Sequence, residues 1–198
     1  MPVDGFSQRW RDFPDYIIGI TQEIWESRGI GTLRDTYAPD LIVRTPMGIS
    51  RGNKGVMAAT MATLHEFPDR RLFADNVIWC DGGGGHLLSS HHIRSTGTHL
   101  NDGAFGSATG KKFRISVIAD CAARNDAIDD EWLVRDYGGI VRQLGMDPQA
   151  YALSLIEAEG GAEACTTPYL PENDIDGPYL SAGNDNEWGA RYADTLMR

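Results

Sequence analysis

The strongest constraint on the fold is a pair of long alternating segments that meet at Asn125-Asp126. In residues 112–124, apolar side chains occupy every second position from Phe113 to Cys121, and mostly polar side chains lie between them. Successive side chains of a β-strand point to opposite faces, so one face of this strand is predicted to meet a core. The Asn-Asp pair suits a tight turn. The pattern therefore predicts an antiparallel hairpin with one buried face.

The register of this hairpin predicts the direction in which Asp136 points. A two-residue turn pairs Ile115 with Asp136 and places Asp136 on the apolar face together with Trp132 and Val134. A carboxylate on that face must find a partner or line a cavity that holds water or ligand. We therefore predict an acid/base site at Asp136. The alternative is that Asp136 caps the helix that follows it.

The same register predicts the outer face of the second strand. Glu131, Leu133 and Arg135 alternate with the inward residues and would point away from the core. Leu133 would then be the apolar centre of a contact between two copies of the chain. We expect a homodimer through this outer sheet face, and a solvated face is the alternative.

Composition limits the class of protein. The chain has 198 residues, enough for one domain of ordinary size with some excess, and its formal net charge of -10 argues against nucleic acid or an anionic membrane as a partner. It contains no run of about 18 apolar residues, so no membrane span is expected. The start of the chain lacks the pattern of a secretory signal. Three scattered cysteines have neither zinc-ligand nor disulfide spacing, which favours a cytoplasmic protein.

The order of elements indicates the fold class. Periodicity and breaker residues predict helices at 15–28, 32–38 and 53–66, with a short strand at 41–44. Long strands are predicted at 71–80, 86–98, 112–124 and 128–136, followed by a helical turn at 137–145 and a closing helix at 148–159. Helices followed by antiparallel strands are typical of an α+β domain, with helices packed on one face of a curved sheet. We assign this domain to residues 1–160.

The end of the chain has a different composition. Residues 161–186 are acidic and rich in Pro, Gly and Asn, which is typical of a linker or tail. Residues 187–198 then carry Trp188, Tyr192 and Leu196 at helical spacing. This terminal helix either docks on the domain or is the opening helix of a truncated second copy.

The sequence argues against a phosphate loop and a metal site, but it leaves two histidines as candidate site residues. The run of glycines at 82–85 is followed by a predicted strand, so it lacks the helix N-terminus of a phosphate loop. The histidines of strand 86–98 are too widely spaced to chelate a metal ion, and we expect none. Alternation places His91 and His99 on one face. We select His99 as a proton carrier or hydrogen-bond donor and His91 as a substrate contact.

Four segments, in this order, resemble the SnoaL-like polyketide cyclase family of the nuclear-transport-factor-2-like superfamily. They are FPDRRLFADNVIW at 67–79, HHIRSTGTH at 91–99, ATGKKF at 108–113 and EWLVRDYGGIVRQLG at 131–145. The resemblance covers roughly residues 16–145. It implies a cone-shaped α+β barrel, with helices in the concave face of a strongly curved antiparallel sheet, a deep apolar pocket and a dimer through the outer sheet face.

The resemblance also implies a reaction. Members of the family close a ring by a cofactor-free aldol reaction, in which an aspartate on the last strand acts as acid/base, and the matching position is Asp136. A histidine of the family on the neighbouring strand would fall near residues 120–122, where this chain has none. The superfamily also contains isomerases, dehydratases and non-catalytic binders, so the fold does not settle the function.

We therefore predict a cofactor-independent acid/base enzyme, a cyclase, isomerase or lyase, that acts on a small apolar carbonyl-bearing molecule. Asp136 would remove a C–H proton, and His99 or Tyr37 would donate a hydrogen bond to the developing enolate oxygen. The expected pocket lining, with Phe113 near the mouth, is Trp132, Val134, Ile115, Val117 and Phe113. The alternative is a non-catalytic small-ligand-binding or interaction module on the same fold.

Overall fold

The computed structural model describes residues 3–164 and 187–196. Two helices open this part of the chain, α1 (Phe13–Trp25) and α2 (Ile30–Thr36). They are followed by β1 (Tyr37–Thr45), β2 (Gly48–Arg51), α3 (Asn53–Glu66), β3 (Arg71–Gly83), β4 (His86–Thr98), β5 (Lys112–Arg124) and β6 (Ala127–Arg135). Three helices come last, namely α4 (Tyr137–Gln143), α5 (Pro148–Ala158) and α6 (Glu187–Leu196).

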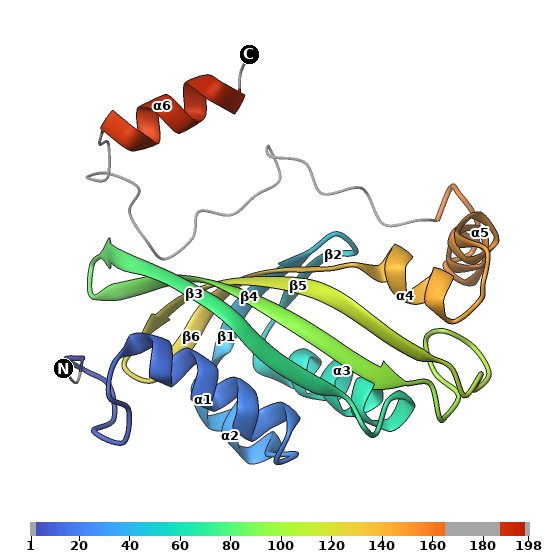
Figure 1. The fold of residues 1–198 in the computed structure, drawn as a ribbon, viewed down its shortest axis with the longest axis horizontal. Coiled ribbons are helices and arrows are strands. Elements are labelled where there is room, and N and C mark those ends of the chain that lie inside the picture. The colour runs from blue at the N-terminus through green and yellow to red at the C-terminus, as the bar shows by residue number, and fades with distance from the viewer. Residues whose placement is uncertain (1–2, 165–186, 197–198) are drawn as a thin grey trace.

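All six strands form one curled, open sheet in the order β2-β1-β6-β5-β4-β3 (Figure 1). The predicted α+β class with helices in the concave face is confirmed, but the sheet is mixed rather than wholly antiparallel. β1 runs parallel to β6, with Val43 opposite Glu131. Four strands and a helix separate β1 from β6 in sequence, so no local pattern predicts this pairing. Residues 48–51, which form β2, were not predicted as a strand.

Helices α1, α2 and α3 lie on the same side of the sheet, and α4 and α5 lie beyond one end (Figure 1). The start of α1 is set by Asp12, whose side chain accepts the backbone N–H of Asp15 at 2.9 Å. The helix then buries one apolar stripe against the sheet, as its spacing predicts: Tyr16, Ile17, Ile20 and Ile24. The concave side of the sheet and these helices enclose the core of the molecule.

The β5–β6 hairpin contains a β-bulge that the sequence pattern did not predict. The turn at Asn125-Asp126 has positive φ at both residues, and the predicted pair Ala123–Ile128 is present. The next pair is Ala122 with Asp130, which leaves one extra residue on β6 and shifts the register by one. Every later pair is therefore displaced from the predicted register.

The bulge reverses the faces of β6, because a shift of one residue moves each side chain to the other side of a sheet. Glu131, Leu133 and Arg135 point to the concave face, and Glu131 is only 5 % exposed. Trp132 and Val134 lie on the outer face, where Val134 is 52 % exposed. The predicted inward positions of Trp132 and Val134 are wrong, and so is the predicted outward position of Leu133.

Asp136 lies just beyond β6 and caps α4. Its side chain is exposed and accepts the backbone N–H of Gly139 at 2.7 Å. The predicted inward position of Asp136 is therefore wrong, and the capping alternative is confirmed. The physical reason is the bulge, which uses one residue of β6 and leaves Asp136 past the end of the strand.

The predicted linker at 161–186 lies almost entirely outside the described residues. Helix α6 lies in the segment where a terminal helix was expected. That this helix docks on the domain, or opens a truncated second copy of it, stays a prediction. Among the helices of residues 3–164 and 187–196, none is long and apolar enough to cross a membrane.

Candidate active site in the concave face

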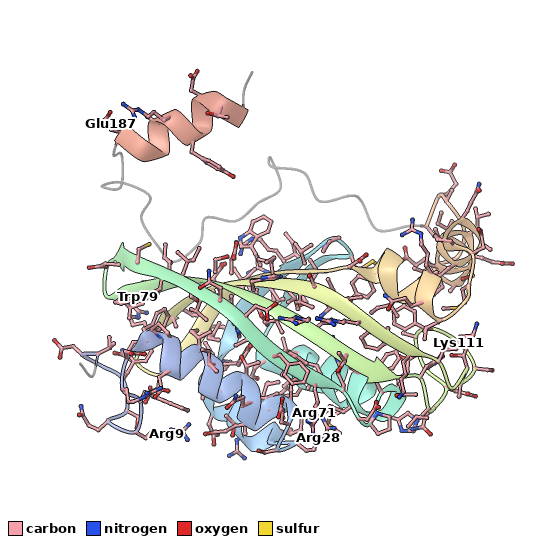
Figure 2. All side chains as sticks on the ribbon, in the orientation of Figure 1. Arg9, Arg28, Arg71, Trp79, Lys111 and Glu187 are labelled. Carbon is pink, nitrogen blue, oxygen red and sulfur yellow. The ribbon has the colours of Figure 1, made fainter. Side chains whose placement is uncertain are left out.

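A cavity of about 70 Å³ lies between the concave face of the sheet and helices α1–α3. Figure 2 shows side chains from the helices and the sheet meeting in this layer. A water molecule needs about 10–15 Å³ of such space, so the cavity holds roughly five waters or a small organic molecule. Much of the lining is aliphatic, but it also includes two threonines, a cysteine and five larger polar groups: Tyr37, Arg70, His91, Glu131 and Arg135.

Glu131 is the acid of this cavity. Its side chain lines the cavity and makes no hydrogen bond within the described part of the chain. Burial raises the pKa of Glu131 from its ordinary 4.5 to about 7, while the charge of Arg135 opposes this shift and that of Asp130 adds to it. Near neutral pH the carboxyl group is therefore present in both its charged and its protonated form.

His91 supplies a neutral polar group on the same face. Its side chain is 2 % exposed, and its Nε2 atom is buried without a hydrogen-bond partner among residues 3–164 and 187–196. Burial, together with the nearby His92, lowers the pKa of His91 to about 4. The imidazole is therefore uncharged at neutral pH and can donate or accept a single hydrogen bond through Nε2, depending on its tautomer.

Tyr37 and Arg70 are two further polar groups of the lining. Burial, followed by the charge of Glu131, raises the pKa of Tyr37 well above its usual value, so its hydroxyl stays protonated. The Nε atom of Arg70 donates to Ser95 Oγ at 3.1 Å. Burial and, after it, the charge of Arg135 lower the pKa of Arg70 to about 9, and the guanidinium remains charged at pH 7.

Strand pairing determines the spacing of these groups. Cys121 pairs with Glu131, and His91 pairs with Ala119, the inward neighbour of Cys121. Two strand spacings of about 4.8 Å and one step of two residues place the Cα atoms of Glu131 and His91 roughly 12 Å apart. Their side chains both point into the cavity, so a small molecule held there can contact both groups.

The family of the protein follows from its sequence profile. The SnoaL-like polyketide cyclase profile matches residues 15–144, which contain all of the cavity-lining residues. The chain belongs to the SnoaL-like polyketide cyclase family. This confirms the resemblance inferred over roughly residues 16–145. No curated protein is significantly similar to this chain in sequence.

Solved structures of similar fold include SnoaL-like and related proteins. IdmH, a proposed polyketide cyclase from Streptomyces antibioticus, is 22 % identical with a TM-score of 0.59, over 67 % of this chain and 98 % of IdmH. AclR, a proposed hydroxylase from Streptomyces galilaeus, is 15 % identical with a TM-score of 0.59, over 68 % of this chain and 96 % of AclR. A ketosteroid isomerase-like protein from Catenulispora acidiphila, in complex with trimethylamine, is 12 % identical with a TM-score of 0.52, over 66 % and 93 %. At these identities the likeness shows the fold alone.

Within this SnoaL-like fold, only part of the predicted pocket lining reaches the cavity. Tyr37, His91 and Val117 line it as predicted. Phe113 and Ile115 are buried in the hydrophobic core but are not part of the lining, so their predicted pocket positions are wrong. Trp132 and Val134 are on the opposite face, as the bulge requires.

His99 is held in a separate buried cluster. Its Nε2 atom lies 3.3 Å from Glu66 Oε1, and its Nδ1 atom lies 3.2 Å from Thr109 Oγ1. Glu66 also accepts the backbone N–H of Phe105 at 2.8 Å, which ties the loop after β4 to the end of α3. His99 is not among the cavity-lining residues, so its expected position beside the cavity is wrong.

Sequence reasoning missed Glu131, Arg135 and Arg70 as site residues. Glu131 and Arg135 belong to the run that was selected, but the unbulged register assigned them to the outer face. Arg70 stands in a polar connection with no periodicity that would signal its burial. In the described ranges, no three His, Cys, Asp or Glu side chains gather in a way that could hold a metal ion.

The outer face of the sheet carries a second, more open hollow of about 670 Å³. Trp132, predicted to line the inner pocket, contributes to this hollow together with Ile78 and Leu88. The guanidinium of Arg44 lies 5.1 Å from the ring centre of Trp132 and pairs with Asp130 through Nη1, at 2.7 and 2.6 Å from its two oxygens.

Proposed function

We propose that the protein is a cofactor-independent acid/base enzyme of the cyclase, isomerase or lyase type. Its substrate is a small carbonyl-bearing molecule, bound in the cavity between the sheet and α1–α3, and Glu131 is the group that accepts a proton. The observation that carries this proposal is a buried carboxyl group that lines a cavity, lacks a hydrogen-bond partner within the described chain, and has its pKa raised to about 7. Membership of the SnoaL-like family supports the reaction type.

The reaction begins with proton transfer from carbon. The Glu131 carboxylate takes a proton from the carbon next to the substrate carbonyl, and the electron pair of the C–H bond moves to the carbonyl oxygen as an enolate. A base whose pKa lies near the working pH is best suited to this step. In a cyclisation, the enolate carbon attacks a second carbonyl carbon, and the resulting alkoxide takes the proton from Glu131. In an isomerisation, a double bond conjugated with the enolate lets Glu131 return the proton to a different carbon of the conjugated system.

Two neutral groups are suited to donate a hydrogen bond to the enolate oxygen as it becomes negatively charged. Tyr37 retains its hydroxyl proton because its pKa is raised, and His91 can donate through Nε2 in the matching tautomer. Arg135 adds a positive charge on the same strand as Glu131. Preorganised donors of this kind stabilise an enolate more strongly in a buried site than in water.

The proposal is tested with a glutamine variant at the proposed base and an asparagine variant at the cap. Exchange of α-protons of acetone, 2,5-hexanedione and levulinate in D₂O is followed by proton NMR. We expect Glu131→Gln to lower the catalysed rate by at least about 100-fold, the usual contribution of a positioned base. Asp136→Asn serves as the matched control, with a rate within about threefold of the parent protein. Equal rates for the parent and Glu131→Gln would reject the proposal.

The pH profile gives a second check. The base form of Glu131 increases as pH rises through its pKa of about 7, so the exchange rate should rise over the same interval. His91 does not titrate there, since its pKa lies near 4. A ligand that stabilises the protein without any catalysed exchange would instead favour the non-catalytic binding module.

We further propose that two copies associate through the outer sheet face. Large apolar side chains are exposed there on three strands, among them Ile78, Ile118 and Val134. Ile118 and Val134 are direct partners across β5 and β6, and such exposed apolar pairs suit a contact between two copies. Sedimentation velocity should show a dimer for the parent protein and a monomer for Ile118→Lys. A parent protein that stays monomeric across the micromolar range would contradict this.

A further inference from the structure

We infer that the substrate carries a carboxylate, which binds the guanidinium group of Arg70 at the end of the cavity opposite Glu131. This inference rests on the proposed function, because it assigns a substrate class to the same cavity. It replaces the small apolar carbonyl-bearing molecule expected from the sequence with a small keto acid, in which the acidic C–H and the carboxylate lie at opposite ends.

The first observation is that Arg70 is buried and forms no ion pair with a described residue, although the charge of Glu66 acts on it from a greater distance. Its side chain is 3 % exposed and lines the cavity. The only hydrogen bond from its side chain to the described residues runs from Nε to Ser95 Oγ, which leaves both terminal nitrogens without one. Its guanidinium carbon lies 5.0 Å from the ring centre of Trp25 and 5.8 Å from that of Phe113. These contacts orient the guanidinium but supply no negative charge.

Arg44 provides the comparison within the same molecule. It is 2 % exposed, and its charge is matched by Asp130, itself 1 % exposed, at 2.6 Å. An uncompensated charge in the interior of a protein is strongly unfavourable. Since this chain matches one buried arginine with its own carboxylate and leaves the other open to a cavity, the missing charge for Arg70 is best supplied by a bound molecule.

The second observation is the balance of charge around the cavity. Among the described lining residues, Glu131 is the one acid, whereas Arg70 and Arg135 are both cations. The two guanidinium groups are close enough that Arg135 lowers the pKa of Arg70. An anion bound between or beside them would relieve this repulsion. A carboxylate also matches the guanidinium fork, which can donate two parallel hydrogen bonds.

The third observation is the order of these groups along the sheet. On the concave face, Glu131 pairs with Cys121, Arg135 pairs with Val117, and Ser95, which holds Arg70, pairs with Ile115. Arg70 and Glu131 are thus at opposite ends, and Arg135 lies between them. With a volume of about 70 Å³, the cavity suits a short molecule that has its carboxylate at one end and its reactive carbonyl carbon near the other.

The test uses two probes that differ mainly in charge. Levulinate has a ketone and a carboxylate, and 2,5-hexanedione has a second ketone where levulinate has the carboxylate. Binding is measured by calorimetry and by thermal shift at low ionic strength. We expect the parent protein to bind levulinate at least about tenfold more tightly than 2,5-hexanedione, as a charge-assisted hydrogen bond would give. Equal binding of the two probes, or no binding of levulinate, would overturn the inference.

Substitutions then assign the preference to one side chain. Arg70→Met should remove the preference for levulinate, and Arg71→Met, at the exposed neighbouring residue (Figure 2), should retain it. Without ligand, Arg70→Met should melt at the same temperature as the parent protein or higher, since it removes an unmatched buried charge. Arg70→Lys keeps the charge without the fork and should weaken levulinate binding at least about threefold, which tests the site even if the methionine variant does not fold. Unchanged levulinate binding in Arg70→Met, or in Arg70→Lys if the methionine variant does not fold, would overturn the inference.

Glu131→Gln separates this inference from the proposed function. It should retain the levulinate preference while losing proton exchange. If Glu131→Gln still catalyses exchange but Arg70→Met loses the preference, the proposed role of Glu131 fails and the carboxylate site stands. If Glu131→Gln loses exchange but Arg70→Met binds levulinate as the parent protein does, the carboxylate site fails alone.

Discussion

The two faces of β6 differ in how their charged groups are matched. On the outer side, Asp130 is paired with Arg44, and this arginine also lies beside the ring of Trp132. On the inner side, Glu131 is buried next to a cavity without a hydrogen-bond partner in the described chain. The two outer charges neutralise each other in an ion pair within the fold. The inner carboxyl group instead faces a cavity, where a bound molecule can reach it.

Three of the four carboxyl groups in residues 129–136 therefore have three different roles. Asp130 forms a buried ion pair, Glu131 lines the cavity, and Asp136 caps α4 from an exposed position. Residue type does not distinguish them. Burial and partners do, and both depend on the single extra residue of the bulge at Asp129.

Deleting Asp129 should have the largest effect, because it should exchange the inner and outer faces of β6. The deletion restores the unbulged register, so Trp132 turns inward and Glu131 turns outward. We expect a loss of more than about 4 kcal/mol of unfolding free energy, measured by urea unfolding and circular dichroism. Asp129→Ala is the control, because it keeps the bulge and removes only the 2.8 Å contact with His86. Similar stability of the deletion and the control would contradict the importance of the register.

The pH dependence of stability should reveal the inner carboxyl group. The folded pKa of Glu131 is about 7, above its ordinary 4.5, so the folded protein holds this proton more tightly than the unfolded chain. The resulting stability is fully present below pH 4.5 and is lost as pH rises through 7. Compared with Glu131→Gln, the parent protein should lose roughly 3 kcal/mol between pH 4.5 and pH 8. Urea unfolding at several pH values measures this, and a difference that does not vary with pH would count against a buried Glu131.

Two neighbouring apolar residues on β5 allow the two faces of the sheet to be compared without changing any charge. Val117 is 3 % exposed on the inner face, and Ile118 is 37 % exposed on the outer face. Val117→Ala should cost about 2 kcal/mol, because it removes buried apolar groups. Ile118→Ala should cost less than about 0.5 kcal/mol in thermal unfolding at low protein concentration, where association does not contribute. Equal losses would show that the outer face is as well packed as the inner one.

The smallest expected effect concerns the cap. Asp136→Ala removes the hydrogen bond to the N–H of Gly139 and should cost about 1 kcal/mol. Asp136→Ser, which can cap the helix, should restore most of this stability. Neither variant should change proton exchange. A stability equal to that of the parent protein in urea unfolding of Asp136→Ala would mean that the cap contributes nothing.

Much of the fold could be predicted because its signals are local. The helix at 53–66 and the strands at 86–98 and 112–124 have the bounds expected from periodicity and breaker residues. The parallel pairing of β1 with β6 could not be predicted in this way, since it joins segments separated by most of the domain. Of the site, Tyr37, His91 and Val117 were predicted from strand alternation or the choice of nearby donors.

The sequence by itself determined the α+β class, the family and the run of residues, Glu131–Asp136, in which the reactive carboxyl group was sought. Only the tertiary structure decided which carboxyl group of that run is buried. Alternation along a strand is a local property, but the face that each residue takes after a bulge depends on how the whole hairpin packs against the helices. Arg70 illustrates the same limit, because its burial arises from Trp25, Ser95 and Phe113 on three separate elements.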